Sequence, residues 1–336
     1  MNKDMTRLLI ESTVRRALLR ADSPAREARN LIDLGLNFSS GRFQKRLFSI
    51  AQAMLCDEHS AYYTLIRDML AHVDRDRLLT FGVNLGYEGC TKGARIIRAV
   101  EAAEGFNIPW ALSLALDAQR CRSAPEAYPA VLDEARALGV HTFLLACGDA
   151  LCFAPLLRTA DDCAFALFVR AEQVTDAFLD SLEAAPNALV CVQTGDGDAD
   201  ACARLRARRY PYAVWTRYSE TPAVTGGQWL RHALALHPQF AFLSPAPDCP
   251  DACRRDVYEY VLAVRDGQRH PVLLMELQQD LLLIDRFVSD DVCLAAFDEA
   301  GRLHSPASAG PGAPCELFRA SLREILAAHF PRAAQR

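Results

Sequence analysis

The sequence predicts an α/β fold: a partial (β/α)6 TIM-like barrel with an all-helical N-terminal region and a small β-rich C-terminal extension. Three observations lead to this prediction. Residues 1–76 show apolar positions at near-helical spacing only, and from residue 77 to 267 short apolar runs alternate with helical stretches. Residues 268–336 then offer three further short β-like runs before a closing helix. Strand–helix alternation is typical of a parallel sheet with right-handed crossovers.

The N-terminal region is expected to contain helices and no strands. Its leading apolar positions are spaced for one helical face, namely Leu8, Leu9, Val14, Leu18 and Leu19. Two more helical stretches are expected from Phe43 to Leu55 and from Ser60 to Val73. The block holds slightly more basic than acidic residues, which suits either a protein-binding surface or an ordinary solvated helical face.

Six short apolar runs are expected to form the strands of the barrel. They are Leu78–Leu85, His141–Ala146, Ala164–Val169, Ala188–Gln193, Tyr210–Thr216 and Gln239–Leu243. Helices are expected between the later ones, and Pro109–Leu116 is predicted to be an additional strand. In barrels of this kind chemistry gathers at the C-terminal ends of the strands.

The C-terminal extension is expected to contain β-runs at Val272–Leu277, Leu281–Phe287 and Val292–Phe297, and then a helix from Glu316 to Phe330. Glu276 lies inside the first of these runs. A carboxylate in an apolar environment is a candidate acid with a perturbed pKa. If Glu276 faces the barrel it is a functional candidate, whereas on an edge strand it is simply solvated.

Composition excludes several classes of protein. The chain has 336 residues, of which 51% are hydrophobic and 24% charged, so it is too apolar to be disordered. No apolar run reaches the ~18 residues that would span a bilayer, and the first twenty residues carry seven charges, which argues against a signal peptide. A net charge of -5 gives no electrostatic reason to expect nucleic acid. We therefore expect a cytoplasmic protein.

The chain contains twelve cysteines, and without a signal peptide reduced thiols are expected. No C-x-x-C occurs, and the closest pairs are Cys249/Cys253 and Cys147/Cys152. This local spacing gives no compact cassette for zinc or an iron–sulfur cluster. Cys249 and Cys253, expected at a helix start, could bind a metal with distant partners or be two half-buried thiols.

Two segments carry a family resemblance. Val83-Asn84-Leu85-Gly86-Tyr87-Glu88-Gly89-Cys90 resembles the C-N-L-x-C-x-x-C segment that follows the first barrel strand of radical S-adenosylmethionine (SAM) enzymes. Cys147-Gly148-Asp149-Ala150-Leu151 is similar to the G-G-E-P-L turn after the second strand of that family. Leu189–Gln193 runs into a Gly/Asp-rich turn where the family often has S-I-E/D-G. Together with element order, the resemblance spans about residues 78–304.

The resemblance implies a site at the barrel mouth. There the three cysteines of the family hold a 4Fe–4S cluster, but Val83 and Tyr87 stand at two of the positions and only Cys90 is kept. The turn after the second strand holds the amino group of SAM, which implies a cofactor-binding role for its counterparts here. The implied cofactor-binding residues are Asn84, Tyr87, Cys147, Gly148 and Gln193.

Each candidate also has an ordinary structural explanation. Cys90 could be a remnant iron ligand, a nucleophile or a small buried side chain. Tyr87 could hydrogen-bond a ligand or fill the cluster cavity. Asn84 and Asp149 could simply cap local turns and helix starts.

The functional prediction is a radical-SAM-like protein that has lost its cluster ligands, a pseudoenzyme that serves as an accessory or ligand- or peptide-binding protein. A 4Fe–4S cluster is not expected, and the sequence leaves open whether SAM binds. One alternative is a genuine enzyme, SAM-dependent or acting through Cys90, Asp149 or Glu276 as catalytic residues. A second is a protein-interaction module that works through the helical N-terminal region.

Overall fold

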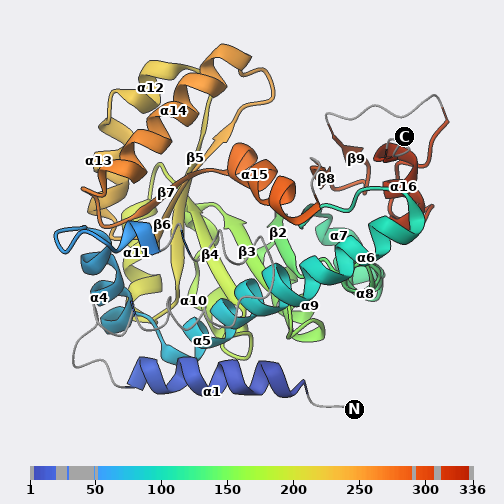
Figure 1. Cartoon of the computed structure of the whole chain (residues 1–336), viewed down its shortest axis with the longest axis horizontal. Helices are drawn as coiled ribbons and strands as arrows, with labels where there is room; N and C mark the ends of the chain where they lie inside the picture. The colour runs from blue at the N-terminus through green and yellow to red at the C-terminus, as the bar shows by residue number, and fades with distance from the viewer. Residues whose placement is uncertain are drawn as a thin grey trace. The chain divides into compact units, whose positions relative to one another are not determined.

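The structure is a computed structural model, and it describes residues 4–19, 29, 49, 52–289, 293–305 and 312–332 (Figure 1). The chain divides into two compact units, each built from three segments. Unit 1 comprises residues 1–79, 170–175 and 189–280, and unit 2 comprises residues 80–169, 176–188 and 281–336. The predicted helix Phe43–Leu55 lies mostly outside the described residues.

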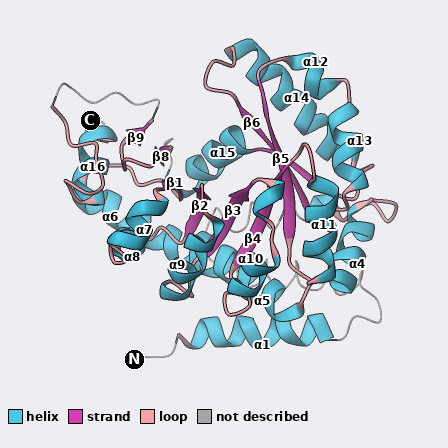
Figure 2. Ribbon diagram, turned by 180° about the vertical axis from the view of Figure 1, so that it is seen from behind, coloured by secondary structure: helices cyan, strands magenta, loops and turns pink. Residues whose placement is uncertain are grey.

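Unit 1 contains four parallel strands in the order β4-β5-β6-β7. These strands are β4 (Ala188–Gln193), β5 (Tyr212–Tyr218), β6 (Phe240–Pro245) and β7 (Leu273–Glu276). Helix α11 packs against β5 (Figure 2), and α14 packs against β7. The helices of this unit are α1 (Met5–Leu19), α4 (Tyr62–His72), η3 (Ala171–Gln173), α11 (Asp198–Ala207), α12 (Thr221–Thr225), α13 (Gln228–Ala235) and α14 (Asp251–Gly267).

Unit 2 contains the parallel strands β3-β2-β1-β8, and β9 pairs antiparallel with β8. The strands are β1 (Ala111–Leu116), β2 (Thr142–Cys147), β3 (Ala164–Val169), β8 (Ala295–Phe297) and β9 (Leu303–His304). The helices are η1 (Asn84–Gly93), α6 (Ala94–Glu104), α7 (Ala118–Ser123), α8 (Ala127–Ala137), η2 (Ala150–Cys152), α9 (Phe153–Thr159), α10 (Asp176–Ser181) and α16 (Leu322–His329). Helix α5 (Arg75–Val83) precedes η1, and α15 (Leu277–Ser289) precedes β8.

The predicted α/β class with a partial barrel of parallel strands is confirmed, since eight of the nine described strands pair in parallel with a neighbour. The bounds of β3 coincide with the predicted run Ala164–Val169, and those of β4 with Ala188–Gln193. None of the described helices is long and apolar enough to cross a membrane. The division into an N-terminal region, a barrel and a C-terminal extension stays a prediction.

The predicted strand Leu78–Leu85 is wrong, because this segment is helical. Helix α5 ends at Val83 and leads directly into η1, a π-helix of 10 residues. Leu79, Val83, Tyr87 and Cys90 are all buried, and their spacing of three and four residues is that of a helical face. The first strand of the parallel sheet is therefore β1, which the sequence predicted only as an additional strand.

The predicted strand Leu281–Phe287 is also wrong, since α15 covers it. Its polar Asp285 is 2% exposed and accepts a hydrogen bond from the backbone N–H of Trp110 at 2.6 Å. The described residues of the C-terminal extension thus hold the short strands β7, β8 and β9, with helix α15 in place of the second predicted run. Its closing helix α16 begins at Leu322, where Ser321 and Glu324 form a capping box.

The π-helix η1 is fixed against the sheet of unit 2 by polar and backbone contacts. The side-chain amide of Asn84 is fully buried and donates hydrogen bonds to the carbonyls of Asp161 and Cys163, each at 2.8 Å. At the other end of η1, a Cβ atom on Gly93 would lie 2.3 Å from the carbonyl oxygen of Gly139. Only glycine allows the backbone to approach so closely.

We expect Gly93→Ala to lower the free energy of unfolding by about 2–3 kcal/mol, because the added methyl group meets backbone that cannot move aside. Gly86→Ala is the matched control, since it lies in the same π-helix and its Cβ would meet no atom within 4 Å. The control should gain up to about 1 kcal/mol from helix propensity. Urea denaturation of both variants checks this, and equal stabilities would contradict the contact.

Candidate functional site

The candidate site lies at the carboxyl ends of β1 and β2 in unit 2, the edge where parallel sheets bind ligands. Strand β1 ends at Leu116, and the Asp117 side chain caps α7 by accepting from the Gln119 N–H at 2.8 Å. Strand β2 ends at Cys147, and Asp149 accepts from the Leu151 N–H at 3.1 Å to start η2. These two caps give the site its shape, because each turns the chain sharply where a strand ends.

A cavity of about 470 Å³ opens between the segments that follow these two strands. Its volume falls within the range of small-ligand pockets, roughly 300–1,000 Å³. Arg122 and Asp149 form an ion pair of 3.1 Å at its wall, and Leu151 is 49% exposed beside them. We call this cavity the β1–β2 groove. The groove is lined by Cys121, Arg122, Pro125, Glu126, Tyr128, Pro129, Asp149, Leu151, Cys152, Pro155, Leu156 and Thr159.

Three cysteines lie on the segments next to the groove. Cys121 lies in α7, Cys147 ends β2, and Cys152 ends η2. Cys121 and Cys152 both line the groove. Burial raises the pKa of Cys121 and of Cys147 to about 12, and the neighbouring Cys152 adds to both shifts. At neutral pH these two thiols are therefore protonated.

The sequence prediction found only part of this site. Cys147, Gly148 and Asp149 do lie at the carboxyl end of the second strand, as the resemblance implied. Cys121 was not singled out, because the strand before it was not recognised as the first of the sheet. The sequence did carry a signal for this part of the site, since Cys121 follows closely after the short apolar run Pro109–Leu116.

Asn84, Tyr87 and Cys90 lie elsewhere, on η1. The Cys90 side chain is buried against that of Trp110, which directly precedes β1, and burial raises the pKa of the Cys90 thiol to about 12. Asn84 bonds to carbonyls just before β3. These contacts belong to the amino ends of the strands. The structure therefore does not bring the two resembling segments together at one edge of the sheet.

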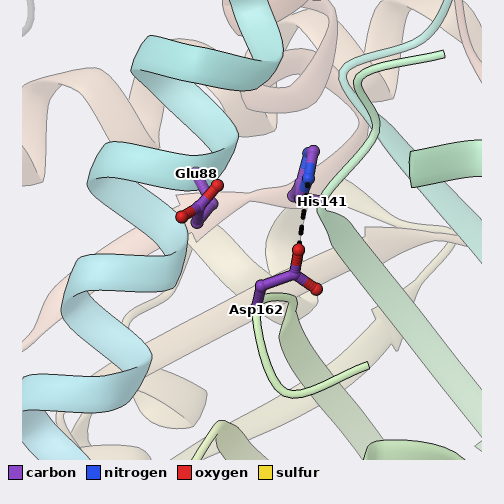
Figure 3. A group of neighbouring side chains, drawn as sticks. All are labelled: Glu88, His141 and Asp162. Atoms are coloured by element: carbon purple, nitrogen blue, oxygen red, sulfur yellow. Dashed lines mark ion pairs between the residues drawn. The ribbon is translucent and has the colours of Figure 1, made fainter. Parts of the chain in front are cut away.

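Figure 3 shows a buried polar cluster at the same amino ends, made of Glu88, His141 and Asp162. The three side chains have the donor types of a metal site, but each carboxylate already faces a cation. The Lys92 ammonium lies 2.8 Å from Glu88, and the Arg136 guanidinium lies 2.9 Å from Asp162. A divalent ion would be repelled by both cations, so this cluster is explained as a structural ion network.

His141 is the central member of that network. Its Nδ1 lies 3.0 Å from the Gly139 carbonyl, and its Nε2 lies 3.8 Å from Asp162. Burial lowers the pKa of His141, so the imidazole is neutral at physiological pH and Nδ1–H donates to Gly139. The ring thereby ties the start of β2 to the turn before it.

Unit 1 holds the remaining candidates. Gln193 is the last residue of β4 and is half-buried. Glu276 ends β7 and is fully buried, so it is not a solvated edge residue. Its carboxylate accepts from the Tyr218 hydroxyl at 2.9 Å and from the Gln279 N–H at 2.6 Å. Burial raises the pKa of Glu276 above its usual range.

The other predicted thiol pair lies at the start of α14 in the same unit. Cys249 and Cys253 are both buried, and all twelve cysteines of the chain are free thiols. Burial raises the pKa of the Cys249 thiol, and the neighbouring Cys253 adds to that shift. The pair offers too few soft ligands for a closed metal site.

Comparison with known proteins shows the fold alone. No family model and no curated protein matches the chain. Streptococcus suis SuiB bound to SAM is similar over 69% of this chain and 66% of its own, with a TM-score of 0.53 and 9% identity. SuiB bound to its precursor peptide SuiA gives a TM-score of 0.51, 9% identity, and coverages of 70% and 68%. SuiB alone gives 0.50, 10% identity, and coverages of 87% and 73%.

SuiB is a radical SAM enzyme, so the chain has a radical-SAM-like fold, and it spans about two thirds of the SuiB chain. The family's cluster loop follows the first strand. The segment that follows β1 here carries one cysteine, Cys121, while Val83–Cys90 is helical. The residues therefore do not fit the family's cluster loop, and no step can be assigned to such a cluster.

The buried carboxylate of Glu276 predicts a specific pH dependence. The folded state keeps its proton to higher pH than the unfolded state, so this group makes the free energy of unfolding fall as pH rises from acidic toward neutral. Glu276→Gln should flatten that fall, because an amide can still accept from Gln279 and donate to the Tyr218 hydroxyl. Denaturant unfolding across this pH range measures it. The exposed Glu259→Gln is the control, and an unchanged slope in Glu276→Gln would contradict the assignment.

Proposed function

We propose that this protein binds a peptide segment in the β1–β2 groove and acts as an accessory protein without radical chemistry of its own. The observation that carries the proposal is the position of the groove. It is a cavity of about 470 Å³ at the carboxyl ends of two parallel strands in a radical-SAM-like fold. That edge is where such folds place their ligands.

The walls of the groove suit an apolar side chain on a peptide. Pro125, Pro129, Pro155 and Leu156 line it together with the exposed Leu151. Apolar walls with a few polar groups are typical of ligand pockets, where the polar groups fix orientation. The fold neighbour SuiB has been captured with its precursor peptide, which supports peptide as the ligand class.

The absence of radical chemistry is proposed from the sequence. Radical SAM chemistry needs a cluster that passes one electron into SAM. The chain has no C-x₃-C-x₂-C segment, and the segment after β1 offers a single cysteine. A partner enzyme would then carry the chemistry, and this protein would present the peptide.

Peptide binding can be tested by selecting a displayed library of random peptides on the full-length protein. Enriched sequences should carry an apolar anchor residue. Leu151→Asp should weaken their binding by at least about 10-fold, because a charge would face the apolar walls. Leu262→Asp is the matched control, since Leu262 is an exposed leucine on α14, 39% exposed. Peptides that bind both variants equally, or no enrichment at all, would overturn the proposal.

SAM is the second candidate ligand, favoured by the turn after β2. Cys147-Gly148-Asp149 stands at the second strand, where the family resemblance implies a contact to the amino group of SAM. Calorimetry with SAM should give saturable heat. Gly148→Ala should weaken it without disturbing packing, because a Cβ there meets no atom within 4 Å. Gly82→Ala, with equally open surroundings, is the control. An absence of heat would eliminate SAM and leave the peptide proposal standing.

A further inference from the structure

The two faces of the unit 1 sheet differ in burial. One face carries a row of four aliphatic side chains, paired in register across the four strands and each 0% exposed, namely Val192, Val214, Ala241 and Leu274. Successive residues of a strand point to opposite faces. The next row therefore points to the other face, and it consists of Gln193, Trp215, Phe242 and Met275. Phe242 is 5% exposed, and the other three are half-buried.

Helices of the unit cover the first face. The indole N–H of Trp229 on α13 donates to the hydroxyl of Thr194, two residues after Val192, at 3.1 Å, and α14 packs against β7. Parallel sheets are normally buried on both faces. The half-buried second row therefore marks a surface that a ligand can still cover. We call this surface the open face, and its residues are Gln193, Trp215, Arg217, Phe242 and Ser244.

The open face combines an aromatic surface with two polar side chains. Trp215 and Phe242 are paired in register on adjacent strands, and the Phe240 ring lies 5.8 Å from that of Phe242. Arg217 follows Trp215 by two residues on the same face, is exposed, and forms no ion pair with any described residue. The side-chain amide of Gln193, half-buried beside Trp215, likewise has no hydrogen-bond partner in the part of the chain that the structure describes. This combination suits a ring that carries an acid group.

We propose that the open face binds a small aromatic monocarboxylate. The ring stacks on Trp215 beside Phe242, and the carboxylate accepts two parallel hydrogen bonds from the Arg217 guanidinium. Alternate residues on one face of a strand are about 6.6 Å apart, so a linker of a few carbon atoms joins the two contacts. The Gln193 amide lies on the other side of Trp215, where it accepts from a ring N–H.

The charge of the open face selects a single acid group. Its five residues supply one cation, Arg217, and a planar guanidinium matches one carboxylate. A nucleotide carries several phosphate charges and would need further cations beside Arg217. The aromatic surface in turn favours a flat ring over an aliphatic acid, because a ring gains a stacking contact with Trp215.

A second polar group near the same strand ends is already complete. His232 Nε2 lies 2.7 Å from the Asp198 carboxylate, which also accepts from the Gly195 N–H at 2.9 Å. The Asp198 side chain is 5% exposed. These contacts join the loop after β4 to α13, so the pair is explained by packing on the helix-covered face and needs no ligand.

The experiment is calorimetric titration of the full-length protein with indole-3-propionate and, separately, with its neutral amide. We expect the acid to bind saturably at one site and the amide to bind at least about 10-fold more weakly, because the charged hydrogen bonds to Arg217 are lost. Arg217→Gln should weaken binding of the acid by a similar factor and leave binding of the amide unchanged. Arg255→Gln is the matched control, since Arg255 is an exposed arginine of α14 in the same unit.

Fluorine NMR of the chain labelled with 5-fluorotryptophan locates the bound ring. The chain has three tryptophans, Trp110, Trp215 and Trp229, whose signals are assigned with single Trp→Phe variants. Indole-3-propionate should shift the Trp215 signal and leave the other two in place. The proposal is overturned if no saturable binding occurs, if acid and amide bind equally, or if Trp215 does not respond.

The proposal does not depend on peptide binding. All residues of the open face belong to unit 1, whereas the residues of the β1–β2 groove belong to unit 2. Failed peptide selection together with intact binding of indole-3-propionate would therefore reject only the proposed function. Peptide selection that succeeds without binding of the acid would reject only the aromatic carboxylate site.

Discussion

The buried amide of Asn84 is the contact on which the architecture of unit 2 depends. It donates hydrogen bonds to the carbonyls of Asp161 and Cys163, which lie just before strand β3. Asn84 begins the π-helix η1, and Gly93 at the other end of η1 lies close to the backbone of Gly139. Unpaired carbonyls at this depth would cost about 1–3 kcal/mol each. The amide therefore holds η1 across the amino ends of the strands, and the neutral His141 and the paired carboxylates complete the same layer.

The two ends of the strands in unit 2 therefore differ in their surroundings. The amino ends are closed by polar groups that have partners already, as Lys92 and Arg136 show for Glu88 and Asp162. The carboxyl ends finish in capped turns, a groove and protonated thiols. The stabilising contacts and the proposed ligand-binding groove thus use separate surfaces, as in barrel folds generally. Changes in the groove should accordingly leave the packing of η1 intact.

Sequence reasoning succeeded where a short apolar run was also bounded by clear turn residues. The strands β3 and β4 are such runs, and their bounds were predicted correctly. It failed at Leu78–Leu85 and Leu281–Phe287, because short apolar runs fit a buried helix as well as a strand. The prediction of the site failed for the same reason. With the first strand misplaced, the resemblance singled out Cys90, and the groove-lining residues Cys121 and Cys152 are too far apart in sequence to give a local spacing.

The pairing of β1 with β8 has a consequence for synthesis on the ribosome. Strand β1 begins at Ala111, yet the neighbour that covers its outer edge begins at Ala295. While the chain is still being made, that edge presents unpaired backbone groups to any other nascent strand. The edge of β1 must therefore remain shielded, or wait unpaired, until β8 (Ala295–Phe297) has left the exit tunnel.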